Sequence, residues 1–295
     1  YAAERGIEIV PEIDLPAHMV SALAAYPHLG CTGGPYDLMT VWDIAKDVLC
    51  VGKDSSFDFL EDVLSEICEI FPYEYIHIGG DECPKIRWEN CPHCQARIKA
   101  LGLKDTDKWK AEHYLQNYVM GRVEKYLNEK GRRIIGWDEI LEGNASKTAT
   151  VMEWRDQQHA VNAVRRGNDV IITTRHYCYL DYCQTSDPEN EPLCIAHRYL
   201  SMEQVYRLDP YDRIFIHEYD KVLGVQGNLW TEFISDFAHV QHMLLPRLAA
   251  ISETAWAYDR KDNYEDFAVR AKALLPGLYQ SYGYNYAPYF FEDIE

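Results

Sequence analysis

The stretch Tyr75-Ile76-His77-Ile78-Gly79-Gly80-Asp81-Glu82 decides the fold of this 295-residue chain. Its first half is a short, mainly apolar run, as expected of a strand that is buried on both faces. Two glycines and two adjacent carboxylates follow directly. On a regular strand neighbouring side chains point to opposite faces, but the glycines allow the chain to leave the pleat. The stretch therefore predicts a buried strand that delivers both acids to one end of a sheet.

Similar runs recur along the chain and alternate with longer amphipathic stretches. The expected strands are Ile7–Ile13, Tyr73–Ile78, Arg133–Trp137, Ala149–Trp154, Val170–Thr174 and Val222–Trp230. The expected helices are Phe57–Ile70, Lys108–Lys130, Gln158–Arg166, Met202–Tyr206, Phe237–Ala250 and Tyr264–Leu278. Asp54-Ser55-Ser56 is expected to cap the first helix and Gly131 to end the second. The alternation predicts an α/β fold with a parallel sheet.

Two architectures fit this alternation, a doubly wound open sheet and a (β/α)8 TIM barrel. Acidic or aromatic residues end nearly every expected strand, namely Glu12 and Asp14, Asp81 and Glu82, Trp137 and Asp138, Glu153 and Trp154, and Trp230 and Glu232. In a barrel all strand ends open on one face, where active sites are built. An open sheet places its chemistry at one switch point, commonly with a Gly-rich phosphate loop, and Gly79-Gly80 precedes two acids instead. We therefore expect a barrel.

Six expected strands are two short of a barrel, and two missing βα units amount to roughly 60 residues. The segment Tyr1–Gly6 is typical of the end of a helix. We expect strands one and two to lie upstream of Tyr1. Residues 1–295 would then form one catalytic barrel domain that is incomplete at its N-terminal side.

The composition limits the partners and cofactors. The net charge of −18, from 47 acidic and 29 basic residues, disfavours nucleic acid and anionic lipid. No apolar run approaches the roughly 18 residues of a membrane span. Among the nine cysteines, Cys91-Pro92-His93-Cys94 has the gap of a zinc knuckle or redox pair, and Cys83 is near. Because no second Cys-x-x-Cys follows, we expect a local disulfide or free thiols there, and no metal.

The paired acids and the tryptophans at strand ends carry the candidate chemistry. Two adjacent carboxylates do not ionise together easily, so one can keep its proton and act as a general acid. The alternative is a helix start whose dipole attracts acids. Trp137, Trp154 and Trp230 offer apolar faces for the C–H surface of a sugar, although a single tryptophan is more often core packing. Three of them beside carboxylates favour a sugar site.

The segment His77-Ile78-Gly79-Gly80-Asp81-Glu82 resembles the signature of glycoside hydrolase family 20, the β-N-acetylhexosaminidases. The resemblance continues through four further segments in the family's order and covers almost the whole chain. These segments are Pro11-Glu12-Ile13-Asp14-Leu15-Pro16-Ala17-His18, Gly136-Trp137-Asp138-Glu139, Tyr179-Leu180-Asp181 and Trp230-Thr231-Glu232.

The resemblance implies a retaining, substrate-assisted exo-enzyme without a cofactor. It would remove terminal β-linked GlcNAc or GalNAc from oligosaccharides or glycoconjugates, and the family is one of the exceptions to the two-carboxylate rule. Glu82 would protonate the glycosidic oxygen and later deprotonate water. Asp81 would hold the 2-acetamido nitrogen and stabilise the oxazolinium ion. The segment contains no signal peptide; a secreted or periplasmic location is compatible with the family.

The resemblance also assigns the substrate-binding residues. Tyr179 would donate to the acetamido oxygen, and His18 would orient Glu82. The sugar ring and its N-acetyl methyl group would be enclosed by Trp137, Trp154 and Trp230. The outer hydroxyls would be bound by Asp181 and Glu232. Two departures stand out: the family's substrate-binding Arg and the Asp that partners the His would lie upstream, and Cys183–Tyr199 lacks a tryptophan often found there.

Three other interpretations stay open. A two-carboxylate glycosidase would pair Glu82 with Glu139 or Glu153 and would not need the 2-acetamido group. A metal-dependent hydrolase would use His18, His77 and Asp81. A carbohydrate-binding barrel without activity would have no use for an intact Asp81-Glu82 pair.

Overall fold

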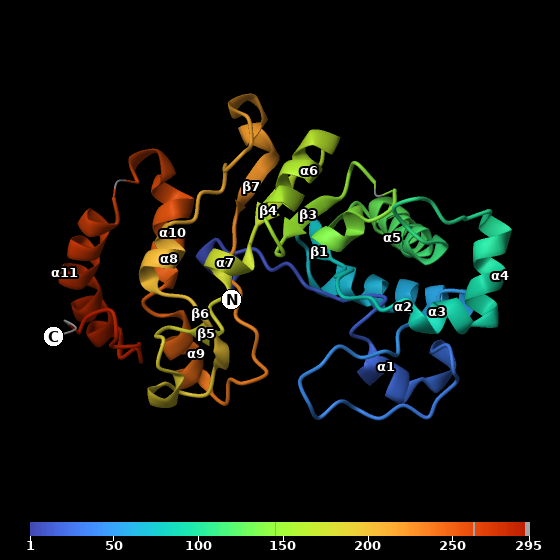
Figure 1. Ribbon diagram of the computed structural model, residues 1–295, viewed down its shortest axis with the longest axis horizontal. Coiled ribbons are helices and arrows are strands. Elements are labelled where there is room, and N and C mark those ends of the chain that lie inside the picture. The colour runs from blue at the N-terminus through green and yellow to red at the C-terminus, as the bar shows by residue number, and fades with distance from the viewer. Residues whose placement is uncertain (145, 262, 293–295) are drawn as a thin grey trace. The chain divides into compact units, whose positions relative to one another are not determined.

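The computed structural model describes residues 1–144, 146–261 and 263–292. The chain divides into two units, a first unit of Tyr1–Met152 with Arg165–Asp169 and a second unit of Glu153–Val164 with the residues from Val170 onward. The division falls within the strand β3 (Thr150–Glu153) and the helix α6 (Gln158–Arg166), both labelled in Figure 1. A single domain over residues 1–295 stays a prediction.

Parallel strands form the centre of the first unit. β1 (Tyr75–His77) pairs with β2 (Arg133–Trp137), and β2 pairs with β3. The strands are short and buried, in agreement with the apolar runs from which they were predicted. The helices of this unit are α1 (Val20–Ala25), α2 (Asp54–Ile70), α3 (Ile86–Asn90), α4 (Pro92–Leu101) and α5 (Ala111–Glu129). Short 3-10 helices occupy Ala3–Arg5, Pro27–Leu29 and Asp138–Leu141.

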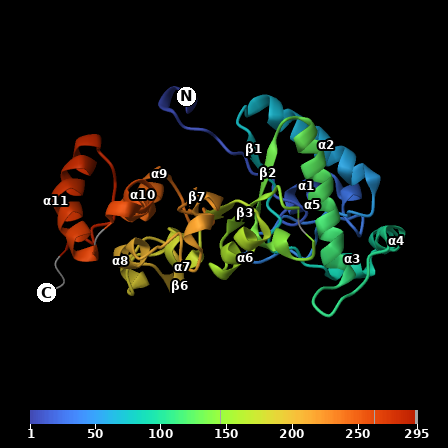
Figure 2. The same cartoon turned by 90° about the horizontal axis from the view of Figure 1, so that it is seen from above.

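The two long helices of the first unit, α2 and α5, lie side by side (Figures 1 and 2). Their apolar residues recur at helical spacing, so that each helix buries one stripe. Phe57 of α2 is buried, and the Arg122 guanidinium of α5 stands 3.9 Å from the centre of its ring. The Tyr126 hydroxyl donates to the Glu61 carbonyl at 2.8 Å. Apolar burial between these helices helps to hold α5, which also packs directly against β2.

The second unit has two parallel pairs of strands. β4 (Val170–Ile172) pairs with β7 (Val222–Val225), and β5 (Tyr182–Cys183) pairs with β6 (Ile195–Tyr199). A disulfide joins Cys183 to Cys194 beside the second pair. The helices are α7 (Arg175–Cys178), α8 (Met202–Tyr206), α9 (Phe237–Leu244), α10 (Leu248–Ala257) and α11 (Tyr264–Tyr282). Short 3-10 helices occupy Pro188–Asn190, Ile216–Lys221 and Tyr258–Arg260.

A hydrophobic cluster holds α8, α10 and α11 together in the second unit. The rings of Tyr206 on α8 and Phe267 on α11 stack with their centres 4.6 Å apart, and Ile251 of α10 belongs to the same cluster. A capping box at Ser201 and Gln204 starts α8. These three helices therefore share one core.

Several elements have the predicted bounds, and others differ for identifiable reasons. β2, α6 and α8 match their predictions. The predicted strand Ile7–Ile13 is wrong for most of its length: Glu12 forms a single parallel bridge with His77 and the residues before Pro11, which has no N–H to donate, are exposed. The predicted helix Phe237–Ala250 is two helices, because Pro246 cannot continue α9.

The predicted helix starts also shift. The predicted cap at Asp54 is wrong, since Asp54 is the first residue of α2 and its carboxylate accepts from Arg97 at 2.6 Å. α5 starts at Ala111 rather than Lys108, because Thr106 and Trp109 close a turn before it. Gly131 follows α5 with a φ of 73°, as a helix end requires. No helix among the described residues is long and apolar enough to cross a membrane.

Candidate active site

The backbone after β1 turns out of the sheet at the two predicted glycines. Gly79 and Gly80 have φ angles of 63° and 100°, which glycine adopts without strain. The Gly79 carbonyl accepts from the Trp137 N–H at 2.9 Å, and Gln116 on α5 donates to the Gly80 carbonyl at 2.6 Å. Glu82 follows with a φ of 44°, a left-handed conformation that costs energy for a residue with a side chain. This part of the chain is held in a shape that a relaxed strand would not adopt.

His18 stands between the two adjacent acids. Its Nε2 atom lies 3.5 Å from an Asp81 carboxylate oxygen and 3.5 Å from a Glu82 carboxylate oxygen. His18 is also left-handed, with a φ of 54°. Hydrogen bonding to Asp81, and then to Glu82, raises the pKa of His18 to about 10. At neutral pH the imidazole is therefore a cation beside both acids.

Asp14 accepts a hydrogen bond from the glycine turn that leads to Asp81 and Glu82. Its Oδ1 accepts from the Gly80 N–H at 3.1 Å. A side chain at position 79 would collide with the Asp14 carboxylate, so the close approach also requires glycine there. Burial, and then the charge of Asp81, raises the pKa of Asp14 to about 9. Asp14 thus keeps its proton at neutral pH.

Trp137 is connected to this group of side chains through Glu12. The Trp137 indole N–H donates to Glu12 Oε1 at 2.9 Å, and the rings of Trp137 and His77 lie 4.9 Å apart. His77 is buried and its Nδ1 accepts from the Gly79 N–H at 3.0 Å. A nitrogen that accepts this bond is engaged in holding the glycine turn. We infer that His77 is a positioning residue of this turn.

The second unit holds an aromatic group centred on Tyr179. Its ring stacks with that of Trp154 at 6.3 Å and an interplanar angle of 20°, and the Trp230 ring lies 6.2 Å away. Tyr179 forms a parallel bridge with Asn228, which fixes its position in the unit. Burial raises the pKa of the Tyr179 phenol, so that its hydroxyl stays a hydrogen-bond donor at neutral pH. The group presents aromatic faces and a donor.

Asp181 lies two residues further along and is buried. Burial raises the pKa of Asp181 to about 7, and the charge of Glu232 acts in the same direction. The fully buried Arg247 donates to the Leu180 carbonyl at 2.5 Å and to the Tyr182 carbonyl at 3.0 Å, so it grips the backbone on both sides of Asp181. Desolvation lowers the pKa of Arg247 to about 9. The guanidinium holds the shape of the Tyr179–Tyr182 segment.

The predicted site residues thus form two groups, one in each unit. The first unit holds His18, Asp81, Glu82 and Trp137, and the second holds Trp154, Tyr179, Asp181, Trp230 and Glu232. Sequence reasoning had assigned no role to Asp14, Glu12 or Arg247. Asp14 and Glu12 belong to the segment Pro11–His18, whose resemblance to the family is the sequence signal for a role of both residues. Arg247 has no motif that would reveal its role.

A carboxylate pair shortly after one parallel strand, with aromatic residues near the ends of others, fits the class of glycoside hydrolases. The family model "Glycosyl hydrolase family 20, catalytic domain" matches residues 1–259. A β-hexosaminidase of Porphyromonas gingivalis is 41% identical over 97% of this chain and 36% of its own length. The chain belongs to glycoside hydrolase family 20.

Solved structures agree with this family and with the barrel class predicted for the fold. A β-N-acetylhexosaminidase of Bacteroides fragilis is 32% identical, with a TM-score of 0.82 over 98% of this chain and 56% of its own. An exo-β-N-acetylglucosaminidase of Vibrio harveyi, solved with N-acetylglucosamine, is also 32% identical, with a TM-score of 0.84 over 97% of this chain and 44% of its own. The chain spans between about a third and somewhat more than half of the length of these relatives.

Proposed function

We propose that this chain carries the catalytic acids of a retaining exo-β-N-acetylhexosaminidase that uses the 2-acetamido group of its substrate as nucleophile. The observation that carries the proposal is the arrangement of Asp81, Glu82 and His18. Both acids stand on one strained turn beside the His18 imidazole, and Asp14 accepts from the Gly80 N–H of the same turn. The Bacteroides fragilis and Vibrio harveyi proteins named above are a β-N-acetylhexosaminidase and an exo-β-N-acetylglucosaminidase.

The proposed reaction has two displacements at C1. In the first, Glu82 gives a proton to the glycosidic oxygen while the acetamido carbonyl oxygen attacks C1, so that the bond to the leaving group breaks. Asp81 accepts the hydrogen bond of the acetamido N–H and stabilises the positive oxazolinium ring. In the second, Glu82 takes a proton from water, which attacks C1 and restores the acetamide. Two inversions retain the configuration at C1.

His18 is proposed to stabilise the ionised form of Glu82 that remains after proton transfer to the leaving group. Glu82 becomes negative when it protonates the leaving group, and a cation at 3.5 Å stabilises that charge. The same cation faces Asp81, whose negative charge the oxazolinium ring needs. His18 is therefore proposed as a positioning and tuning residue, because it acts through both acids.

The remaining candidate residues are proposed to bind the sugar. Tyr179, whose hydroxyl stays protonated, would donate to the acetamido oxygen and align it for attack. The aromatic faces of Trp137, Trp154 and Trp230 suit the methyl group and the C–H surface of the ring. Asp181 and Glu232 would bind outer hydroxyls. The substrate class is a glycan with a terminal β-linked N-acetylhexosamine.

Burial argues against Glu153 as the nucleophile of the two-carboxylate alternative. A nucleophilic carboxylate must reach C1 of the sugar, and Glu153 is fully buried. A tethered acetamido group needs no second carboxylate, and tethering supplies a high effective concentration. The metal-dependent alternative used His18, His77 and Asp81, but the structure groups Asp14 with His18 and Asp81, and His77 does not belong to this group. An unchanged rate in the presence of a chelator would discard this alternative.

The proposal is tested with two matched substrates, p-nitrophenyl N-acetyl-β-glucosaminide and p-nitrophenyl β-glucoside, which differ only at the 2-acetamido group. We expect a kcat/KM at least roughly 1,000-fold higher for the acetamido substrate, because only that substrate has the internal nucleophile. Comparable rates would support the two-carboxylate alternative. A protein that cleaves neither substrate but binds GlcNAc would support a binding barrel.

A further inference from the structure

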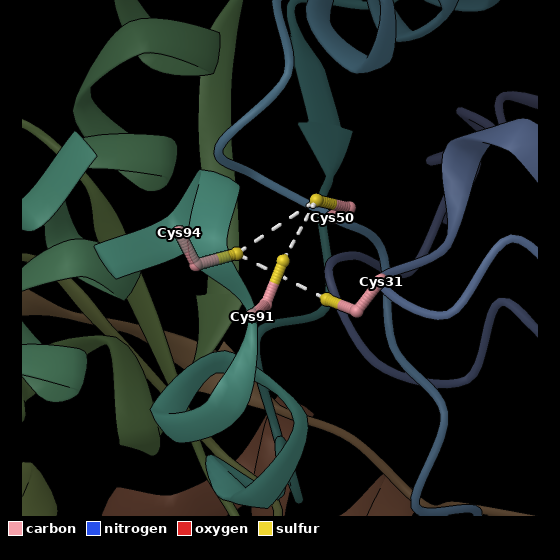
Figure 3. Close-up of side chains that lie close together, drawn as sticks. All are labelled: Cys31, Cys50, Cys91 and Cys94. Carbon is pink, nitrogen blue, oxygen red and sulfur yellow. Dashed lines mark hydrogen bonds between the residues drawn. The ribbon is translucent and has the colours of Figure 1, made fainter. Parts of the chain in front are cut away.

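Four cysteine side chains that are distant in the sequence meet in the first unit. Cys31, Cys50, Cys91 and Cys94 point toward one another (Figure 3), and their Sγ atoms all lie within 4.8 Å of one another. The Sγ–Sγ distances are 3.6 Å for Cys50 and Cys91, 3.8 Å for Cys50 and Cys94, and 3.9 Å for Cys31 and Cys94. Four sulfur atoms thus surround one point.

The backbone is arranged to bring these four residues together. Gly30 and Leu49 form an antiparallel bridge, so Cys31 and Cys50 stand on paired segments, and the Cys50 N–H donates to the Leu29 carbonyl at 2.8 Å. Cys91 is the N-cap residue of α4, and Cys94 lies in the first turn of that helix. A paired turn thus supplies two sulfurs and the start of a helix supplies the other two.

Glycine at position 52 allows these two parts to approach each other. A side chain there would collide with the backbone of His93 and Cys94, so the turn after Cys50 packs directly on the start of α4. Lys53 in the same turn donates to the His28 and Gly30 carbonyls at 2.7 and 2.9 Å. The turn is therefore anchored to both cysteine pairs.

The distances suit a metal ion better than disulfides. Bonded sulfurs lie about 2.05 Å apart. Four thiolates at about 2.3 Å from a tetrahedral zinc ion stand about 3.8 Å from one another, close to the observed separations. Cys50, Cys91 and Cys94 are buried, so thiolates at these positions require a cation beside them. The N-terminus of α4 and the nearby Lys53 add positive charge that partly offsets the excess charge of a ZnS4 centre.

We propose that Cys31, Cys50, Cys91 and Cys94 bind one zinc ion in a closed, structural site. All four positions of the tetrahedron are filled by protein sulfur, so the ion has no open position for substrate or water. Cys31 is the most accessible of the four and provides the side from which the ion enters. The site is separate from the acids that carry the proposed reaction.

The ion would tie a long connection to the helices that follow the catalytic turn. The connection from Cys31 to Cys50 returns at Leu49, whose N–H donates to the Pro16 carbonyl at 2.9 Å, two residues before His18. The Asp47 carboxylate accepts two bonds from Arg87 on α3, at 2.8 and 3.2 Å. Zinc would therefore keep the backbone before His18 in place without contacting substrate.

The test starts with the metal content of the unaltered full chain. Protein produced in zinc-supplemented medium and purified without chelators should contain about one zinc ion per chain, measured by inductively coupled plasma mass spectrometry. Replacement of zinc by cobalt should give the intense visible bands of tetrahedral cobalt thiolate. Both readouts need no substitution and do not depend on activity.

Substitutions then assign the ligands. Cys31→Ser, at the accessible corner, and Cys50→Ser, in the interior, should each weaken zinc binding at least roughly 100-fold in competition with a chromophoric chelator. Cys68→Ser is the matched control: Cys68 is a free cysteine of the same unit outside the cluster, and its variant should keep the full metal content. Cys31→Ser keeps the test decisive even if Cys50→Ser does not fold.

Three results would overturn the proposal. The first is a chain without zinc whose peptides carry disulfides between Cys31, Cys50, Cys91 and Cys94. The second is iron instead of zinc at the same stoichiometry. The third is a loss of zinc in Cys68→Ser as large as that in Cys31→Ser.

Discussion

Replacement of Arg247 by methionine tests how the Tyr179–Tyr182 segment is held. The guanidinium is fully buried and donates to four backbone carbonyls, those of Leu180, Tyr182, Leu200 and Met243. Methionine fills much of the volume but donates nothing. At about 1 kcal/mol for each lost bond the gross destabilisation is about 4 kcal/mol. Relief of the burial cost of the charge offsets part of it, so we expect a net loss of about 2–4 kcal/mol.

The assay is thermal unfolding of the variant and of a matched control. For a domain of this size, 1 kcal/mol shifts Tm by about 2–4 °C, so Arg247→Met should lower Tm by roughly 5–15 °C. Arg270→Met is the control, because Arg270 is 45% exposed and pairs with Glu253 and Asp266 at the surface, where such pairs contribute less than about 1 kcal/mol. Equal shifts in the two variants would refute the role given to Arg247.

Three further predictions concern the first unit. Glu82→Gln should abolish hydrolysis of substrates with poor leaving groups and spare much of the first step for very acidic ones; equal losses would argue against the general acid. Gly79→Ala should lower the free energy of unfolding by roughly 1–3 kcal/mol and should also lower kcat, because its methyl group displaces Asp14. Gly131→Ala is the control: Gly131 has a similar φ but open space around it, so this variant should lower stability alone. The pKa of His18 is raised from 6.5 to about 10, so its contribution to stability is complete below pH 6.5 and is lost as the pH rises through 10. In denaturant titrations from pH 7 to 10, the free energy of unfolding should therefore fall less for His18→Asn than for the unaltered protein.

Local sequence patterns were enough to predict the helices and strands whose bounds are set by neighbouring residues. β2 and α6 have the predicted bounds, because their apolar periodicity is clear and turn residues flank them. The departure of the chain from β1 followed from Gly79-Gly80, and the φ angles of both glycines confirm it. The carboxylate pair was found for the same reason, since its neighbours in the sequence carry the signal.

The features that sequence reasoning missed depend on contacts between distant segments. Cys91 and Cys94 were recognised as a possible pair, but Cys83 was considered as their neighbour because it is near in the sequence. The structure places Cys31 and Cys50 beside them instead, through the Gly30–Leu49 bridge and the close approach at Gly52. Such pairing leaves no local periodicity. The same holds for Arg247, whose acceptors are carbonyls and therefore carry no residue-type signal.

The central claim is that the acetamido group of the substrate is the nucleophile and that Asp81 stabilises the cyclised intermediate. The most direct measurement is the inhibition constant of a GlcNAc-derived thiazoline, a stable analogue of that intermediate, compared with that of GlcNAc. We predict at least roughly 100-fold tighter binding of the thiazoline, and loss of most of that advantage in Asp81→Asn, because the carboxylate then no longer faces a positive ring. A thiazoline that binds no more tightly than GlcNAc would contradict substrate assistance in this protein.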